Sequence, residues 1–591
     1  MEGQSMSPVV LFLGSVAYLY SSVQNARDSP DVFVNTTYGT LKGLKSVSRE
    51  SRTFFEFRGI PYAEPPVGLL RFEPPERPTN WGGIRDATKY GSRCWQLNFI
   101  TQRVDGKEDC LFLNVYTHRV LKKEELGDKL LYPVLVYIHG GFFVSGSSNV
   151  FRPKYFMDEN VVLVTINYRL ASFGFLTTGD DVIRGNMGFK DQNMALQWVQ
   201  ENIAFFGGDP RSVTLVGESA GAVSVHLHML SPMSAGLFHR VISQSGTCCS
   251  LWARGKNPRN QARNLGRQLS CPTQSSQELA ACLKTRSARR IARSHAGFVQ
   301  DLFRGKFYTF GPVVETANDS LTFLADDPKE LLTRGAISNK VPWINGVNAD
   351  EGLIYLIGVI RNESRLASLN LNWTTHAPVL FGFEGNPAQE KIATEIRDYY
   401  LGPNSTISMK NLQDAANMFS DRAFFEDSHD VAVLQSRVSP VYSYYLSYKP
   451  KFGIANFLLS SSGTLPHGLD IVVGNTVQWI SSNLLGRQKI HYGVCHTDEL
   501  PLFYNLPAVT EIIPGSPDYF FSKSIVKLWV SFAKKGKPGS FGGVPWVAVH
   551  STTVTNVTSN IQRIRLDQES ELMDEPFLKR LNFWKSLQLN D

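Results

Sequence analysis

Short, continuous apolar runs recur along the chain and predict buried strands. The clearest of them occupy residues 134–138, 161–166, 213–216 and 341–346. Between the runs, apolar residues recur at helical spacing, for example over 192–203 and 321–334. Buried strands that alternate with helices are typical of a mostly parallel sheet with helices on both faces, so the pattern predicts an α/β fold with a large central sheet.

One of these runs leads into a sharp turn. Residues 213–216 are followed by Gly217-Glu218-Ser219-Ala220-Gly221 and then by a helix-like stretch at 222–230. A G-x-S-x-G turn between a strand and a helix needs glycines because the backbone bends sharply and holds the serine hydroxyl out at the strand tip. The amide of Ala220 then points at any oxyanion formed on the attacked carbon. Ser219 is therefore a candidate nucleophile.

Other segments supply the groups that such a serine requires. The run at 134–138 ends in His139-Gly140-Gly141, and a glycine pair after a strand leaves two amides free of obstruction, which suits an oxyanion hole with Ala220. Farther along, the run at 341–346 precedes Glu351, and His496 comes later. The order serine, acid, histidine is the one expected of an α/β-hydrolase.

Several long, ordered blocks resemble the type-B carboxylesterase and cholinesterase family, and insect-type secreted carboxylesterases in particular. They are residues 57–68 (FRGIPYAEPPVG), 108–116 (EDCLFLNVY), 185–188 (GNMG), Asp191-Gln192, 206–210 (FGGDP), the serine turn and Phe583-Trp584. The resemblance covers about residues 30–588 and implies a single α/β-hydrolase domain. Residues 355–440 and 455–490 are then expected as insertions that form the rim above the site. The segment 457–491 is longer than the family usually has before its histidine.

Carried onto this sequence, the resemblance implies that Ser219 is the nucleophile, His496 the general base and acid, and Glu351 the carboxylate that orients the imidazole. Gly140, Gly141 and Ala220 would supply the oxyanion amides. The chemistry agrees, because an unassisted serine hydroxyl is a poor nucleophile near neutral pH and needs a base.

Each assignment has a rival. Asp350 lies beside Glu351 and could be the orienting acid, although the family pattern favours Glu351. His467 and His491 compete with His496, but nothing around His467 matches the family. His226 and His228 are two apart on a predicted helix and point to different sides, so we expect packing or surface roles and no metal site.

The resemblance is less informative about the substrate. Trp252, Phe307, Tyr308 and Phe310 fall where relatives line the acyl pocket, which favours uncharged aliphatic or aromatic esters, although all four could be ordinary core residues. Glu218 could hold a water or bias the local field, or be only the variable position of the turn. Cholinesterases bind choline on a tryptophan in the loop before Cys110. That tryptophan is missing here, so a cation-π site is not expected.

The cysteines point to an oxidising compartment. By resemblance, Cys94 pairs with Cys110 and Cys271 with Cys282. Cys248, Cys249 and Cys495 remain; we expect Cys495 to be a packed small residue and the adjacent pair to be free, with an intermolecular bridge left open.

Two features of the sequence predict that the protein is exported from the cell. Residues 9–20 form an apolar stretch of signal-peptide length, so residues 1–25 are interpreted as a signal peptide although the n-region is not basic. Glycosylation sequons suit a secreted glycoprotein and lie at Asn35, Asn318, Asn362, Asn372, Asn404 and Asn556. Neither an integral membrane span nor a lipid-anchor tail is expected.

Composition changes this picture little. With 42% hydrophobic and 19% charged residues, the chain can bury a substantial core, and candidate site residues that spread from 140 to 496 must meet in one fold. The net charge of +7 is mild for this length. The densest basic segment, Lys284 to Arg293, is interpreted as a solvated helix face because it lacks stacking aromatics, and no nucleic-acid partner is expected.

These observations predict a secreted serine carboxylesterase that hydrolyses small-molecule esters through an acyl-enzyme and needs no cofactor. Three alternatives stay open: a neuroligin-like adhesion protein without activity, a juvenile hormone esterase, and a triacylglycerol lipase. The glutamate before the serine argues against the second, since juvenile hormone esterases often have glutamine there. The third would need an apolar lid that the sequence does not reveal. No feature of the sequence indicates the oligomeric state.

Overall fold

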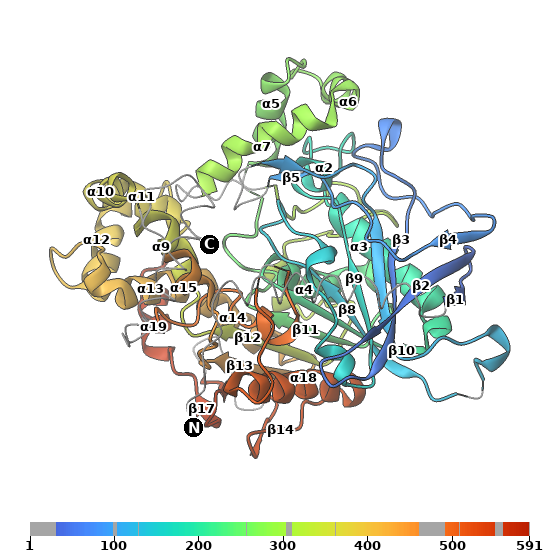
Figure 1. Cartoon of the computed structure of the whole chain (residues 1–591). Helices are drawn as coiled ribbons and strands as arrows, with labels where there is room; N and C mark the ends of the chain where they lie inside the picture. The colour runs from blue at the N-terminus through green and yellow to red at the C-terminus, as the bar shows by residue number, and fades with distance from the viewer. Residues whose placement is uncertain are drawn as a thin grey trace, which may run out of the picture.

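The computed structural model describes residues 31–97, 103–127, 129–255, 257–302, 310–360, 362–459, 491–507, 509–549 and 560–589. A 13-stranded sheet runs through the molecule (Figure 1). Its strand order is β1 (Val32–Asn35), β2 (Thr40–Val47), β3 (Thr53–Pro61), β7 (Phe112–Thr117), β9 (Val162–Ile166), β8 (Tyr132–Ile138), β10 (Gly208–Glu218), β11 (Arg240–Gln244), β12 (Trp343–Asn348), β13 (Val441–Leu446), β16 (Gln562–Leu566) and β17 (Glu571–Asp574), with β4 (Ile84–Asp86) beside β2.

The centre of the sheet is parallel and its two edges are antiparallel. Every neighbouring pair from β9 through β8 and β10 to β16 is parallel. On one side β1, β2, β3 and β7 pair antiparallel, and on the other β17 pairs antiparallel with β16. The α/β fold with a large, mostly parallel sheet is thus confirmed. Because parallel strands end at the same edge, the loops that follow β8, β10 and β12 meet there.

Two hydrophobic cores cover the two faces of the sheet. Side chains alternate along a strand, so Val134, Val136 and Ile138 of β8 face one core while Leu135 and Tyr137 face the other. Helices α3 (Met187–Asn202) and α4 (Ala220–Leu230) bury their apolar residues in the first core, and α18 (Pro517–Lys535) does so in the second. All these strand residues are fully buried, which explains the continuous apolar runs.

Helices that lie away from the sheet form two further groups. One, seen at the left of Figure 1, has a core of its own that includes Trp373, Phe381 and Trp584. It contains α9 (Leu353–Ile360), α10 (Glu363–Leu371), α11 (Trp373–Leu380), α12 (Gln389–Leu401), α13 (Leu412–Ser420), α15 (Ile454–Leu459) and α19 (Leu578–Ser586). The other, at the top of the same view, contains α5 (Pro258–Gln268), α6 (Ser276–Thr285) and α7 (Ala288–Leu302).

The remaining elements are short. The helices are α2 (Ala171–Phe175), α8 (Pro328–Thr333), α14 (Glu426–Gln435) and α17 (Leu500–Phe503), and a π-helical segment, η8 (Asp421–Phe425), joins α13 to α14. Two two-stranded sheets pair β5 (Gln96–Leu97) with β6 (Val104–Asp105) and β14 (Ser540–Phe541) with β15 (Val544–Pro545).

The predicted helix over 321–334 is wrong in its first half. The observed helix, α8, begins only at Pro328. Asp327 caps it, because its carboxylate accepts hydrogen bonds from the amides of Lys329 and Glu330. Proline at the first helical position suits a helix start but not a helix interior, so the apolar residues 321–324 precede the helix. Most of the second predicted insertion, 460–490, lies outside the described residues.

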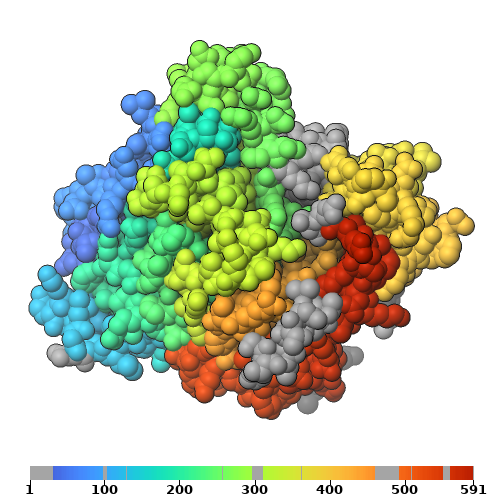
Figure 2. Space-filling view, turned by 180° about the vertical axis from the view of Figure 1, so that it is seen from behind, coloured from blue at the N-terminus to red at the C-terminus, as the bar shows by residue number. Residues whose placement is uncertain are grey.

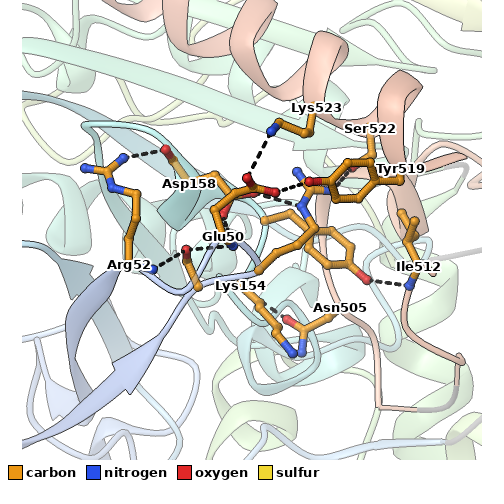
Figure 3. Close-up of polar contacts among 12 residues, drawn as sticks. Glu50, Arg52, Lys154, Asp158, Asn505, Ile512, Tyr519, Ser522 and Lys523 are labelled. Carbon is orange, nitrogen blue, oxygen red and sulfur yellow. Dashed lines mark hydrogen bonds and ion pairs between the residues drawn. The ribbon is translucent and has the colours of Figure 1, made fainter. Parts of the chain in front are cut away.

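A polar cluster fastens α18 to the N-terminal part of the sheet (Figure 3). Glu50, in the turn after β2, accepts a hydrogen bond from the Tyr519 hydroxyl and pairs with Lys523 at 3.1 Å. The amide of Glu50 donates to Asp158 at 2.9 Å, and the backbone of Lys154 donates to Asn505 at 3.3 Å. Segments more than 300 positions apart are thus held together.

Candidate functional site

The turn that carries Ser219 is a strained strand-to-helix junction. Ser219 has φ 58° and ψ −124° between the end of β10 and the start of α4. A Cβ at Gly217 would lie 2.2 Å from the Gly221 carbonyl oxygen, and one at Gly221 would lie 2.0 Å from that of Ile138. Only glycine fits either position. The Ser219 amide donates to the Gln244 carbonyl at 2.8 Å, which ties the turn to β11. The sequence pattern predicted this geometry.

The loop after β8 lies directly against this turn. A Cβ at Gly140 would lie 2.8 Å from the Ser219 Cβ and 2.6 Å from the Glu218 carbonyl oxygen. Gly141 has φ 108°, and Phe142 and Phe143 also have positive φ. In the described part of the chain, the amides of Gly140 and Gly141 donate to no protein acceptor. The amide of Ala220, in the first turn of α4, belongs to the set that a helix leaves unpaired.

The same loop is held from behind by aromatic and polar contacts. The Tyr168 hydroxyl donates to the His139 carbonyl at 2.8 Å, and the two rings stack at 4.5 Å. The Ala171 amide donates to the Phe143 carbonyl at 2.7 Å. Gly146 lies so close to the His139 ring that a Cβ there would contact it at 2.3 Å. The loop is therefore fixed before any ligand binds.

His496 and Glu351 meet although they are 145 positions apart. His496 Nδ1 lies 2.6 Å from Glu351 Oε2, and both side chains are buried. The other carboxylate oxygen of Glu351 accepts the Asn348 amide at 2.8 Å. Asn348 itself donates to the Cys495 carbonyl at 2.9 Å. The carboxylate is thus held between the end of β12 and the segment that carries the histidine.

The rivals considered for these two positions lie elsewhere. Asp350 accepts hydrogen bonds from the Val494 amide at 2.7 Å and from Gln413, so it braces the histidine segment but does not contact the ring. His491 lies near the Pro450 carbonyl at 3.3 Å. His467 is outside the described residues.

The Nε2 side of the His496 ring faces the serine turn. Nε2 lies 3.3 Å from Oε1 of Glu218, the residue immediately before Ser219. A ring whose Nδ1 is held by one carboxylate and whose Nε2 lies beside the residue that precedes Ser219 is suited to act as a general base. The contact of Nε2 with Glu218 also places a second acid next to the ring.

The pKa values of His496 and Glu218 are both raised above their ordinary values. Burial alone would lower the pKa of His496, but the carboxylates of Glu351 and Glu218 outweigh it and raise the pKa to about 9. Burial raises the pKa of Glu218 to about 8, partly offset by His496. Glu351, whose Oε2 lies 2.6 Å from Nδ1, is the carboxylate in closest contact with the ring.

Two neighbours of the histidine were not predicted as site residues. Phe424, in η8, lies 4.8 Å from the His496 ring between centroids, and Trp252 lies 5.9 Å from Phe424. Glu499 accepts hydrogen bonds from Asn348 at 2.6 Å and from Gln244 at 3.2 Å. Glu499 lies three residues after His496, and this closeness in the sequence could have indicated that it belongs to the site. No pattern around Phe424 indicated a role.

The predicted acyl-pocket residues are only partly placed together. Trp252 contacts Phe142 edge-to-face at 5.4 Å as well as Phe424, so it links the glycine loop to the histidine. Phe310 is buried and packs near His295 at 5.8 Å instead. Phe307 and Tyr308 lie outside the described residues.

The histidines and cysteines beyond the site have ordinary packing roles. His226 accepts the Cys248 amide at 3.1 Å, and His228 bonds Ser234 at 2.7 Å. Disulfide bonds join Cys94 to Cys110 and Cys271 to Cys282. Cys248, Cys249 and Cys495 are free thiols in the structure. Among the described residues, no group of three or more metal-type side chains comes together.

Two further features concern the surface. The side chains of the sequons at Asn35, Asn318, Asn362, Asn372 and Asn404 are exposed, whereas Asn556 lies outside the described residues. In the part of the chain that the structure describes, none of the helices is both long and apolar enough to cross a bilayer.

Comparisons with known proteins place the chain among esterases. The carboxylesterase family model matches residues 30–584. Venom carboxylesterase-6 of Apis mellifera is 37% identical over 90% of both chains, and the juvenile hormone esterase of Tribolium castaneum is 35% identical over 93% of both. The crystal structure of a Manduca sexta juvenile hormone esterase with OTFP covalently attached covers 95% of this chain with a TM-score of 0.77 at 24% identity, which shows a shared fold.

Proposed function

Because the chain belongs to the carboxylesterase family and is a carboxylic ester hydrolase, we propose that it is a serine esterase that acts outside the cell on small, uncharged aliphatic or aromatic esters. The observation that carries this proposal is the placement of the His496 ring, with Nδ1 at 2.6 Å from Glu351 and Nε2 directed at the serine turn.

In the proposed reaction, Ser219 Oγ attacks the ester carbonyl carbon while His496 Nε2 accepts its proton. The imidazolium then donates that proton to the departing alcohol, which leaves an acyl group on Ser219. A water that gives a proton to the same ring attacks the acyl carbon, and the acid is released as Ser219 regains its hydrogen. The Glu351 carboxylate stabilises the imidazolium in both steps.

The glycine loop would stabilise the charged oxygen of each tetrahedral intermediate. The amides of Gly140, Gly141 and Ala220 are the proposed donors, and their support is that the first two have no protein acceptor in the described chain. The loss of one such donor typically costs about 3 kcal/mol of transition-state stabilisation. Because contacts on every side hold the loop, these donors would need no reorganisation during the reaction.

The proposed substrate class is based on a row of aromatic side chains beside His496. Phe142, Trp252 and Phe424 form successive ring contacts from the glycine loop to His496. Burial raises the pKa of Glu218, the nearest additional acid. Apolar side chains beside the histidine favour an uncharged acyl or alcohol group. A juvenile hormone ester is the second candidate substrate, supported by the similarity to the Tribolium castaneum enzyme.

An extracellular location is supported by two kinds of residue. Both disulfide bonds close short loops, and such bonds persist in oxidising compartments. The exposed sequon asparagines could accept glycans without disturbing the core.

The test is turnover of p-nitrophenyl acetate and of longer acyl esters, with and without an organophosphate, by the purified protein. We expect inactivation after one serine per chain is phosphorylated, with the adduct on the peptide that contains Ser219. Ser219→Ala should lower kcat by at least about 10⁴-fold. A matched control is Ser224→Ala, which changes a buried serine one turn farther along α4 and should keep most of the activity.

Each alternative gives a different result. Full activity of Ser219→Ala would refute the nucleophile assignment. A wild-type protein that folds and binds a cell-surface partner but turns over no ester would favour an adhesion role. A marked preference for juvenile hormone over simple esters would select the second substrate.

A further inference from the structure

The excess positive charge of this chain is confined to one small part of it. The whole chain has 60 Lys and Arg against 53 Asp and Glu, a net charge of +7. Residues 257–293 contain eight Lys and Arg but only one acid, Glu278, which is also a net charge of +7. The rest of the chain therefore has 52 residues of each sign and is neutral. We call residues 257–293 the basic subdomain.

The basic subdomain projects from the body of the protein. It comprises α5, α6 and the start of α7, which stand clear of the sheet at the top of Figure 1 and again at the top of the view from behind in Figure 2. Its interior is apolar, with Leu265, Leu279, Leu283 and Ile291 buried. The disulfide bond between Cys271 and Cys282 ties the end of α5 to α6. Its cations are thus presented on an ordered platform.

Among the described residues, two of these cations pair with acids of the body of the protein. Lys284 pairs with Glu73 at 2.5 Å, and Arg259 lies 3.9 Å from Asp180. Arg286 donates to the carbonyls of Leu269 and Ser270, which carry no charge. The remaining five form no ion pair with any residue that the structure describes; they are Arg263, Arg267, Arg289, Arg290 and Arg293.

The arrangement of these arginines is unfavourable for the helices that carry them. Arg259, Arg263 and Arg267 follow one another at four-residue spacing along α5, so each repels the next. Arg289 and Arg293 have the same four-residue spacing on α7. The first turn of α7 also contains Arg290, which lies at the positive end of the helix dipole, and this turn contains no acid. Such an arrangement is relieved when anions outside the chain bind it.

We propose that the basic subdomain binds a sulfated polysaccharide chain. Guanidinium groups bind sulfate and phosphate oxygens through paired hydrogen bonds, so a run of arginines matches a polymer with closely spaced sulfates. A membrane fits less well, because none of the large hydrophobic side chains exposed in the described structure lies within 257–293 and none is available to enter a bilayer. A nucleic acid also fits less well, because the segment contains no aromatic residue on which a base could stack.

The experiment uses the full-length protein on immobilised heparin and in solution with heparin over a range of salt concentrations. The variant Arg289→Gln/Arg290→Gln/Arg293→Gln is compared with Lys340→Gln/Lys410→Gln/Lys579→Gln. Both lose three exposed cations, but the second loses them outside the subdomain. A second subdomain variant, Arg263→Gln/Arg267→Gln, moves the change to α5. Turnover of p-nitrophenyl acetate, which should be unchanged, shows that each variant is folded.

We expect both subdomain variants to elute at lower salt, with at least tenfold weaker binding for the triple variant. Each lost contact should lower the slope of log affinity against log salt by about 0.7, as for single-stranded polyanions, or about 2 in total. The control should stay within twofold of the wild type. Equal losses in the subdomain and control variants, or no retention of the wild type, would overturn the proposal. So would tighter binding to phosphatidylserine vesicles or to DNA than to heparin.

Discussion

Replacing Glu351 by glutamine tests the histidine–acid pair most directly. The substitution keeps the shape of the side chain but removes the charge that lies 2.6 Å from His496 Nδ1. At this distance and an effective dielectric constant near 20, the attraction between the carboxylate and the imidazolium is about 6 kcal/mol. Loss of the carboxylate from a serine-histidine-acid arrangement lowers kcat by about 10⁴-fold, or about 5.5 kcal/mol, which is of the same size.

The pH profile of this variant adds a second readout. Only the neutral ring can accept the serine proton, so kcat/KM rises as the pH passes through the pKa of His496. In the wild type, Glu351 and Glu218 raise that pKa to about 9 against the effect of burial. Without the Glu351 charge, burial has the larger influence, and the rising limb should move to lower pH by at least about 1 unit. The variant should thus be slower at its plateau yet reach the plateau at lower pH.

The measurement is steady-state hydrolysis of p-nitrophenyl acetate between pH 5 and 10, corrected for spontaneous hydrolysis. Asp350→Asn is the matched control, because this adjacent acid contacts the Val494 amide and not the ring. An amide oxygen can still accept that hydrogen bond, so kcat should fall less than tenfold. The reasoning is refuted if Glu351→Gln leaves the limb in place or shifts it to higher pH, or if Asp350→Asn has the larger effect.

Three further changes test other parts of the site and its support. Gly140→Ala would place a Cβ 2.6 Å from the Glu218 carbonyl oxygen, so backbone atoms must move, kcat should fall by about 10² or more and the thermal midpoint should fall as well; wild-type activity would contradict the proposed oxyanion loop. Glu218→Gln removes an acid that raises the pKa of His496, so the rising limb of the pH profile should shift to lower pH; an upward shift would count against the 3.3 Å contact. Asp191→Asn leaves the buried Arg169 without its paired carboxylate at 2.6 Å and should cost about 3–5 kcal/mol in urea unfolding, whereas a loss under about 1 kcal/mol would show that the pair is dispensable.

The sequence predicted the strands with the clearest apolar runs and missed the more polar ones. β8, β9, β10 and β12 are buried on both faces, so their runs stand out. β11 reads RVISQ and β13 reads VYSYYL, and their polar residues conceal equally buried strands. The antiparallel edges could not be predicted, because strand direction depends on connections rather than on composition.

The site was predictable where local geometry demands particular residues. The serine turn requires Gly217 and Gly221, and both are visible as a motif. The choice of Glu351 over Asp350 depended on family resemblance, since two adjacent acids look alike until the fold turns one to the ring and the other to Val494. The contact of Phe424 with His496 could not be predicted, because a π-helical segment in a region without motifs places Phe424 beside the histidine.

The separation of the serine turn from His496 along the chain has a consequence for how the protein matures. During synthesis, the ribosome translates the first six strands of the parallel core, with the proposed nucleophile, before it reaches the proposed proton acceptor. Under the proposed mechanism, a partly made chain would therefore turn over no ester, however well its early strands have packed.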